Sequence, residues 1–233
     1  MQNTWNGKKK ALTFSYDDGV LQDIRLIELF NKYGMKATFN LNSAKLGQTA
    51  ELIREGVRVD HSKVHPEDVR RIYEGHEVAV HTLTHPDLPK VACDGDVVRE
   101  IEEDRLRLSE LCGYEVVGMA YPFGTYDERV VRLMREHTGV KYARTVVSTH
   151  AFAPQTELLT FHPTVYHHTE WDTLFALGEQ FLTLTPDEPA LFYVWGHAYE
   201  FDIHDDWARF EDFLRMMAGK ADIFYGTNAE VLL

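Results

Sequence analysis

Two adjacent carboxylates, Asp17 and Asp18, are followed by Gly19 and end a short hydrophobic run near the start of the chain. Two imidazoles, His81 and His85, come directly after another hydrophobic run. Carboxylate oxygens and imidazole nitrogens together can bind a catalytic divalent metal, and a neighbouring carboxylate that does not bind the ion can accept a proton from water. This pattern of residue types indicates metal-assisted hydrolysis.

Each half of the pattern also has an ordinary structural explanation. Asp-Asp-Gly at the end of a strand is often only a turn, because Asp and Gly favour turn backbone. A His-x-x-x-His pair is often two unrelated surface or capping histidines. The two halves together supply three ligands and a spare base after two predicted strands, and this combination favours a site.

The elements that must position these residues alternate between strands and helices. Because the polar residues follow the carboxyl ends of strands, they would meet at the mouth of an α/β barrel. The alternation alone does not separate a barrel from an open doubly wound sheet. Strands are predicted at residues 12–15, 37–41, 77–80, 118–120, 142–145, 191–195 and 223–225, and helices at 24–33, 66–73, 97–111, 127–137, 171–182 and 207–218.

Composition limits the classes of function. With 233 residues, 44% of them hydrophobic, and no linker-like break or repeat, the chain is expected to form one domain over residues 1–233. A net charge of −13 leaves no basic stripe for nucleic acid or an anionic membrane. The absence of a long apolar run and of an apolar leader in this sequence leads us to expect a cytoplasmic protein. Cys93 and Cys112 are expected to be reduced thiols.

Four motifs in chain order resemble those of the polysaccharide deacetylases, the family 4 carbohydrate esterases. The first two are specific in combination, the third is matched in part, and the fourth is a strand that ends in histidine. The resemblance spans nearly the whole chain. The matching stretches are Ser15-Tyr16-Asp17-Asp18-Gly19 with Lys36-Ala37-Thr38-Phe39, Gly75-His76-Glu77 with His81-Thr82-Leu83-Thr84-His85-Pro86, Ala120-Tyr121-Pro122-Phe123-Gly124, and Phe192 to His197.

The resemblance implies a fold and a set of roles. The fold would be a distorted (β/α) barrel with about seven parallel strands. Asp18, His81 and His85 would bind a divalent metal ion, expected to be zinc, with cobalt or nickel as alternatives, because mixed nitrogen and oxygen ligands suit several of these ions. Asp17 would be the general base, and His197 would be the general acid that protonates the leaving amine.

The third motif supplies candidates for contact with the substrate. The backbone N–H of Phe123 is the expected oxyanion donor. The aromatic rings of Tyr121, Phe123 and Trp195 would line a sugar-binding groove, although aromatic residues near strand ends are as often part of the core. The other histidines are not expected to act in the site. His61 and His65 lie in an insertion between Lys45 and Gly75, which is expected to form a loop over the site or at its rim, and the pair His167-His168 is expected to be solvated.

Three departures from the family pattern concern the support of these residues. Ala120 stands where the family has an arginine that holds the catalytic aspartate, and Arg144 on another predicted strand is the candidate replacement. The family's Asp-Trp motif, which orients the acid histidine, has no clear match; Glu200 or Asp202 could replace its carboxylate, with Asp172 a weaker candidate. Finally, Asn40-Leu41-Asn42 stands where a hydrophobic continuation is usual.

The leading hypothesis is a metal-dependent hydrolase that removes N-acetyl groups from an amino sugar, an oligosaccharide or a polysaccharide. An amidohydrolase acting on a small non-sugar amide, or an acetyl esterase, is the alternative on the same scaffold. A non-catalytic domain that binds metal or carbohydrate is the third; it would need neither Asp17 nor His197. The sequence predicts no oligomeric state.

Overall fold

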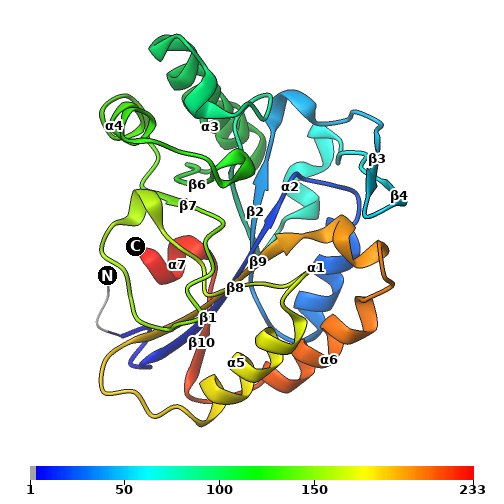
Figure 1. Cartoon of the computed structure of the whole chain (residues 1–233), viewed down its shortest axis with the longest axis vertical. Helices are drawn as coiled ribbons and strands as arrows, with labels where there is room; N and C mark the ends of the chain where they lie inside the picture. The colour runs from blue at the N-terminus through cyan, green and yellow to red at the C-terminus, as the bar shows by residue number, and fades with distance from the viewer. Residues whose placement is uncertain (1–3) are drawn as a thin grey trace.

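Seven parallel strands form a curled sheet in the computed structural model, which describes residues 4–233 (Figure 1). Their order across the sheet is β7-β6-β5-β2-β1-β9-β8. If β7 and β8 were joined, the strands would follow one another around a closed barrel in the same order as along the chain. The predicted distorted (β/α) barrel is therefore confirmed. The strands are β1 (Lys10–Asp17), β2 (Thr38–Leu41), β5 (Glu77–Val80), β6 (Gly118–Ala120), β7 (Tyr142–Arg144), β8 (Val165–Tyr166) and β9 (Ala190–His197).

Two further features complete the β structure. Strand β10 (Ile223–Tyr225) pairs with the first residues of β1, while β2 pairs with its last residues. Strands β3 (Glu51–Arg54) and β4 (Val57–Asp60) form a separate antiparallel hairpin. All seven predicted strands exist, but β8 and this hairpin were not predicted. The reason is that β8 has only two residues, and the hairpin lies mostly exposed, without a hydrophobic run.

The helices pack around the sheet and give the core its outer layer. All eight residues of β1 are buried, as expected for a parallel strand covered on both faces. In the longest helix, Val97, Ile101 and Leu108 are buried in the main hydrophobic core. The helices are α1 (Asp23–Lys32), α2 (Val69–Ile72), α3 (Asp94–Cys112), α4 (Glu128–His137), α5 (Trp171–Thr183), α6 (Trp207–Met217) and α7 (Asn228–Leu232).

Short 3-10 helices and unpaired thiols complete the description. The 3-10 helices are η1 (Ser43–Lys45), η2 (Pro66–Asp68), η3 (Leu88–Lys90), η4 (Pro122–Gly124), η5 (Leu158–Thr160) and η6 (Ala198–Asp202). Cys93 and Cys112 are both free, as predicted. None of the helices formed by residues 4–233 has the length and hydrophobicity that a bilayer-spanning segment needs.

Strand register brings distant polar residues together at the carboxyl edge of the sheet. The last residue of β1, Asp17, lies opposite His197 of β9 and Asn40 of β2. On the other side of the sheet, Ala120 of β6 lies opposite Arg144 of β7. Parallel strands end at one common edge, so the loops that follow them converge on a single mouth.

Candidate metal and catalytic site

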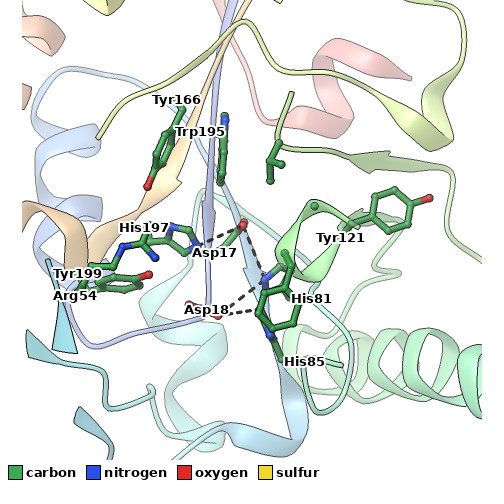
Figure 2. Close-up of a pocket in the computed structure, with 13 residues that line it drawn as sticks. Asp17, Asp18, Arg54, His81, His85, Tyr121, Tyr166, Trp195, His197 and Tyr199 are labelled. Atoms are coloured by element: carbon green, nitrogen blue, oxygen red, sulfur yellow. Dashed lines mark ion pairs between the residues drawn. The ribbon is translucent and has the colours of Figure 1, made fainter. Parts of the chain in front are cut away.

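A cavity of about 430 Å³ opens at this mouth (Figure 2). It is lined by the five residues predicted as metal ligands, base and acid. Tyr121, Phe123 and Trp195 also line it, together with residues that were not predicted, among them Arg54, Tyr166 and Tyr199. The functional residues expected from four separate motifs therefore reach one cavity.

Asp18, His81 and His85 form a cluster that fits a divalent metal ion. Nε2 of each histidine lies 3.9 Å from Oδ1 of Asp18. An ion at roughly 2.1 Å from two ligand atoms spans a separation of up to about 4.2 Å, so both distances fit one ion. Nδ1–H of His81 donates to the carbonyl of Ala120 at 2.8 Å, which leaves the Nε2 lone pair directed at the cluster.

The backbone around this cluster adopts an unfavourable conformation at four non-glycine residues. Asp18 has φ of 84°, Thr82 66°, His85 63° and Phe123 58°. Left-handed backbone costs such residues about 1–3 kcal/mol each and persists where the surrounding structure holds it. Asn42 provides part of that support, because its side-chain amide donates to the carbonyls of His81 and Thr82, the latter at 2.9 Å. The residue noted in the sequence as a departure thus holds the second motif in place.

Asp17 is buried and bound by a guanidinium. Nη2 of Arg144 donates to Oδ1 of Asp17 at 2.6 Å, and Nδ2 of Asn40 donates to the same oxygen at 2.8 Å. Burial raises the pKa of the Asp17 carboxyl, but Arg144, with His81 and His197, outweighs burial and leaves that pKa below its usual value. Asp17 is therefore ionised at neutral pH, and its carboxylate is held in a fixed position.

His197 is paired with a buried carboxylate. Its Nδ1–H donates to Oε1 of Glu200 at 3.0 Å, its backbone N–H donates to Oε2 at 2.9 Å, and the hydroxyl of Tyr166 also donates to Oε1. Burial lowers the pKa of His197, but Glu200 outweighs burial and raises that pKa to about 9. Burial likewise raises the pKa of Glu200, whereas His197 brings it down to about 2. The imidazole is therefore protonated at neutral pH, the state that an acid needs.

The other two carboxylates considered for this role lie elsewhere. Asp202 is exposed, and its Oδ1 accepts a hydrogen bond from the indole of Trp207 at 2.8 Å. Asp172 is fully exposed and pairs with Arg209. Of the three candidates only Glu200 contacts His197, because the 3-10 helix η6 turns the chain back immediately after β9.

The three aromatic candidates differ in what they present to the cavity. The ring of Tyr121 points away from the metal cluster, is buried, and donates its hydroxyl to the carbonyl of Leu159 at 2.7 Å, so Tyr121 borders the cavity with little of its ring exposed (Figure 2). Trp195 is also buried, and its ring packs on Tyr166 and on the guanidinium of Arg144. Phe123 is 63% exposed and presents its ring at the mouth.

Two residues of the inserted segment reach the metal cluster, and sequence reasoning missed both. Nε2 of His61 lies 3.1 Å from Oδ2 of Asp18, and Nζ of the buried Lys63 lies 3.8 Å from Oδ1. His61 is therefore part of the site, where it was not expected to act. His167 and His168 are buried, which corrects the expectation that they are solvated. No motif marks these residues, since their positions depend on how the insertion folds over the mouth.

A sequence profile of the polysaccharide deacetylase family matches residues 4–143. The chain belongs to this family. Among its curated relatives, a chitooligosaccharide deacetylase of Rhizobium leguminosarum bv. trifolii is 41% identical over 73 residues, 30% of this chain and 33% of the relative. A chitin deacetylase of Arthroderma benhamiae is 28% identical over 137 residues, 58% of this chain and 33% of the relative. The matches cover only about a third of the length of these relatives.

Solved structures share the fold of this polysaccharide deacetylase family member at low identity. A family 4 carbohydrate esterase from Streptomyces lividans, in complex with acetate, superposes with a TM-score of 0.60 at 16% identity over 94% of this chain and 92% of that one. A family 4 pseudoenzyme from Bacillus anthracis gives a TM-score of 0.58 at 16% identity over 96% and 66%. At such identities the likeness establishes the fold alone.

The arginine beside Asp17 comes from strand β7, not from the partly matched third motif. Ala120 stands at the motif position of the family arginine, and Arg144 is its direct neighbour across the β6–β7 pair. From there the guanidinium reaches Asp17, as predicted from the sequence for a replacement. An arginine on β7 thus places a positive charge beside the carboxylate of Asp17, although the motif position on β6 holds an alanine.

Proposed function

We propose that the chain is a metal-dependent hydrolase that removes N-acetyl groups from an amino sugar, an oligosaccharide or a polysaccharide, with residues 1–233 as one catalytic domain. The observation that carries the proposal is the position of Asp17 and His197, register partners on the neighbouring strands β1 and β9, beside the Asp18–His81–His85 cluster. Family membership and the names of the relatives, a chitooligosaccharide deacetylase and a chitin deacetylase, support the substrate class.

In this mechanism the side chains have separate tasks. A divalent ion held by Asp18, His81 and His85, with zinc the first choice, would polarise the acyl oxygen and lower the pKa of water. Asp17 accepts the proton of the attacking water. Arg144 keeps its carboxylate ionised, and therefore able to accept a proton, and fixes it in place. His197 donates a proton from Nε2 to the leaving amine, since Nδ1 is bound to Glu200.

The backbone N–H of Phe123 is the proposed oxyanion donor. Its positive φ results from the tight turn of η4, after which the N–H of Gly124 bonds to the carbonyl of Tyr121 at 2.9 Å. A preorganised donor of this kind lowers the barrier by about 3–4 kcal/mol in acyl transfer. Phe123 lines the cavity close to His85, with ring centroids 4.6 Å apart, so the N–H belongs to the segment that borders the metal cluster.

The test is acetate release from N-acetylglucosamine oligomers by metal-stripped protein, with and without added zinc or cobalt. We expect turnover only with metal. Asp17→Asn, which keeps the shape of the side chain, should abolish turnover while metal binding measured by calorimetry is retained. Turnover by this variant at the wild-type rate would refute the assignment of the base.

The same assay addresses the other candidates. Release of acetate from simple N-acetyl amides or acetyl esters, but not from sugars, would keep the mechanism and change the substrate. Tight metal binding with no turnover of any of these compounds would identify a binding domain, and the Bacillus anthracis pseudoenzyme gives a precedent for this fold without activity.

A further inference from the structure

The guanidinium of Arg54 forms part of the cavity wall. Arg54, at the end of β3, lines the cavity on the side of His197 and Tyr199, and 45% of its side chain is exposed (Figure 2). Among residues 4–233 its recorded polar contact is an ion pair with Glu200, with Nη2 3.9 Å from Oε1, which is too long for a hydrogen bond. The N–H groups of Arg54 are thus available to a ligand.

Glu200 does not need this arginine. Its two oxygens already accept hydrogen bonds from the Nδ1–H and backbone N–H of His197 and from the hydroxyl of Tyr166. A guanidinium offers five donors in a planar fork that matches a carboxylate. The N–H groups of Arg54 can therefore bind a ligand that enters the cavity.

The hairpin that carries Arg54 is fixed to the body of the protein. The carboxylate of Glu55, at the turn between β3 and β4, accepts hydrogen bonds from Nε2 of His168 at 2.7 Å and from Nε2 of His204 at 2.9 Å. Glu55 has φ of 53°, a conformation unfavourable for glutamate, and the two hydrogen bonds hold it there. The neighbouring Arg54 is thereby presented at a defined place although its side chain is half exposed.

The charge of Arg54 contrasts with that of the chain. The net charge is −13, yet the cavity wall displays a guanidinium whose side chain forms no hydrogen bond with any of residues 4–233. The cavity's other charges are matched internally, since Asp17 pairs with Arg144 and Asp18 lies beside Lys63. A neutral sugar has only hydroxyl and acetamido groups to offer, whereas a carboxylate would form a charge-assisted, bidentate pair with the guanidinium.

Resting on the proposed function, we propose that Arg54 binds a carboxylate of the substrate, so that the preferred substrates are N-acetylated compounds bearing a carboxylate near the scissile amide. An acidic amino sugar and an N-acetyl amino acid share this chemistry. The guanidinium orients the substrate through its carboxylate while the acetamido group enters the metal cluster. Arg54 is thus a specificity-determining residue that acts mainly on KM.

The test compares four substrates with metal-loaded protein. They are a neutral N-acetylglucosamine dimer, an N-acetyl amino sugar with a lactyl carboxylate, the methyl ester of that sugar, and an N-acetyl amino acid. The variants are Arg54→Ala, Arg54→Lys and the matched control Arg58→Ala. Arg58 belongs to the same hairpin, is 69% exposed, pairs with Glu51 and does not line the cavity.

We expect wild-type kcat/KM for one of the two acids to exceed that for the neutral compounds by about 10- to 100-fold, and to fall as salt screens the pair. Arg54→Ala should remove this advantage through KM and leave the neutral dimer unchanged, Arg54→Lys should keep part of it, and Arg58→Ala should have no effect. The acid that shows the advantage identifies the substrate as a sugar or an amino acid.

Equal kcat/KM for the acidic sugar and its ester, with no advantage for the N-acetyl amino acid, would overturn the inference. An equal loss on acidic and neutral substrates in Arg54→Ala would also overturn it, because a structural partner of Glu200 would behave in that way. If no substrate is turned over, the proposed function fails, and calorimetry decides the inference separately. The acids should bind metal-loaded Asp17→Asn protein about 10-fold or more tightly than the Asp17→Asn/Arg54→Ala double variant.

Discussion

Replacement of Arg144 by methionine would leave the buried carboxylate of Asp17 without its cation. The exposed fractions of the two side chains are 1% and 3%, so little water can replace the guanidinium. Removal of one partner from a buried pair costs about 3–5 kcal/mol. At 1.36 kcal/mol per factor of ten, that energy corresponds to a decrease in kcat/KM of about 10²- to 10⁴-fold if it falls on the transition state.

The direction of the pH effect follows from the same pair. Burial raises the pKa of Asp17, and Arg144 is the largest influence that opposes burial, so replacing Arg144 should raise the pKa of the base. Activity of Arg144→Met should therefore recover as pH rises, whereas the wild type keeps an ionised base to lower pH. The assay is acetate release from about pH 5 to about pH 10. Zinc stoichiometry should remain unchanged, because the guanidinium of Arg144 forms its hydrogen bonds with Ser15, Thr145 and Asp17 and not with the metal cluster.

Two controls separate charge from packing. Arg144→Lys keeps a cation but loses the bidentate pair, so its activity should lie between those of the wild type and Arg144→Met. The double variant Ala120→Arg/Arg144→Met places the guanidinium on β6, at the register partner of residue 144. It should restore part of the activity that Arg144→Met loses. If Arg144→Met kept kcat/KM within about threefold of the wild type across this pH range, the argument from charge would be refuted.

Three further changes test the supports of the site. Glu200→Gln should move the alkaline limb of kcat/KM from about pH 9 toward 6.5, since the protonated acid exists only below the pKa of His197 and Glu200 is what raises it; an unmoved limb would exclude His197 as the acid. Asn42→Ala should weaken zinc binding by about 10-fold or more in a chelator competition, because Asn42 holds the backbone carbonyl of His81, and unchanged affinity would show that the loop holds itself. Gly196→Ala should lower the free energy of unfolding by about 1–3 kcal/mol in urea titrations, because the added Cβ would lie 1.9 Å from the ring of His167; wild-type stability would mean that the ring moves freely.

The positions of the proposed metal ligands and base were accessible from the sequence because their signals are local. A hydrophobic run that ends in Asp17-Asp18, and another that ends before His81 and His85, place those side chains at strand ends through burial and turn chemistry alone. The same local patterns predicted six strands of the curled sheet and strand β10. Strand β8, with two residues, was too short for such a signal, and the mostly exposed β3–β4 hairpin has no hydrophobic run.

The contacts that hold Asp17 and His197 in place depend on the tertiary structure. Arg144 contacts Asp17 because β6 and β7 pair in the register that places it beside Ala120, and the sequence could offer it only as a candidate. Glu200 rather than Asp202 pairs with His197 because a 3-10 turn directs one carboxylate inward and leaves the other in solvent.

The inserted segment shows the same limit most clearly. His61 and Arg54 reach the mouth only after a hairpin, which no hydrophobic pattern marks, folds against the body. Hydrophobic period and turn chemistry are properties of neighbouring residues and can be read along the chain. Contacts across strands and loops depend on register and packing, which are set by the whole molecule at once.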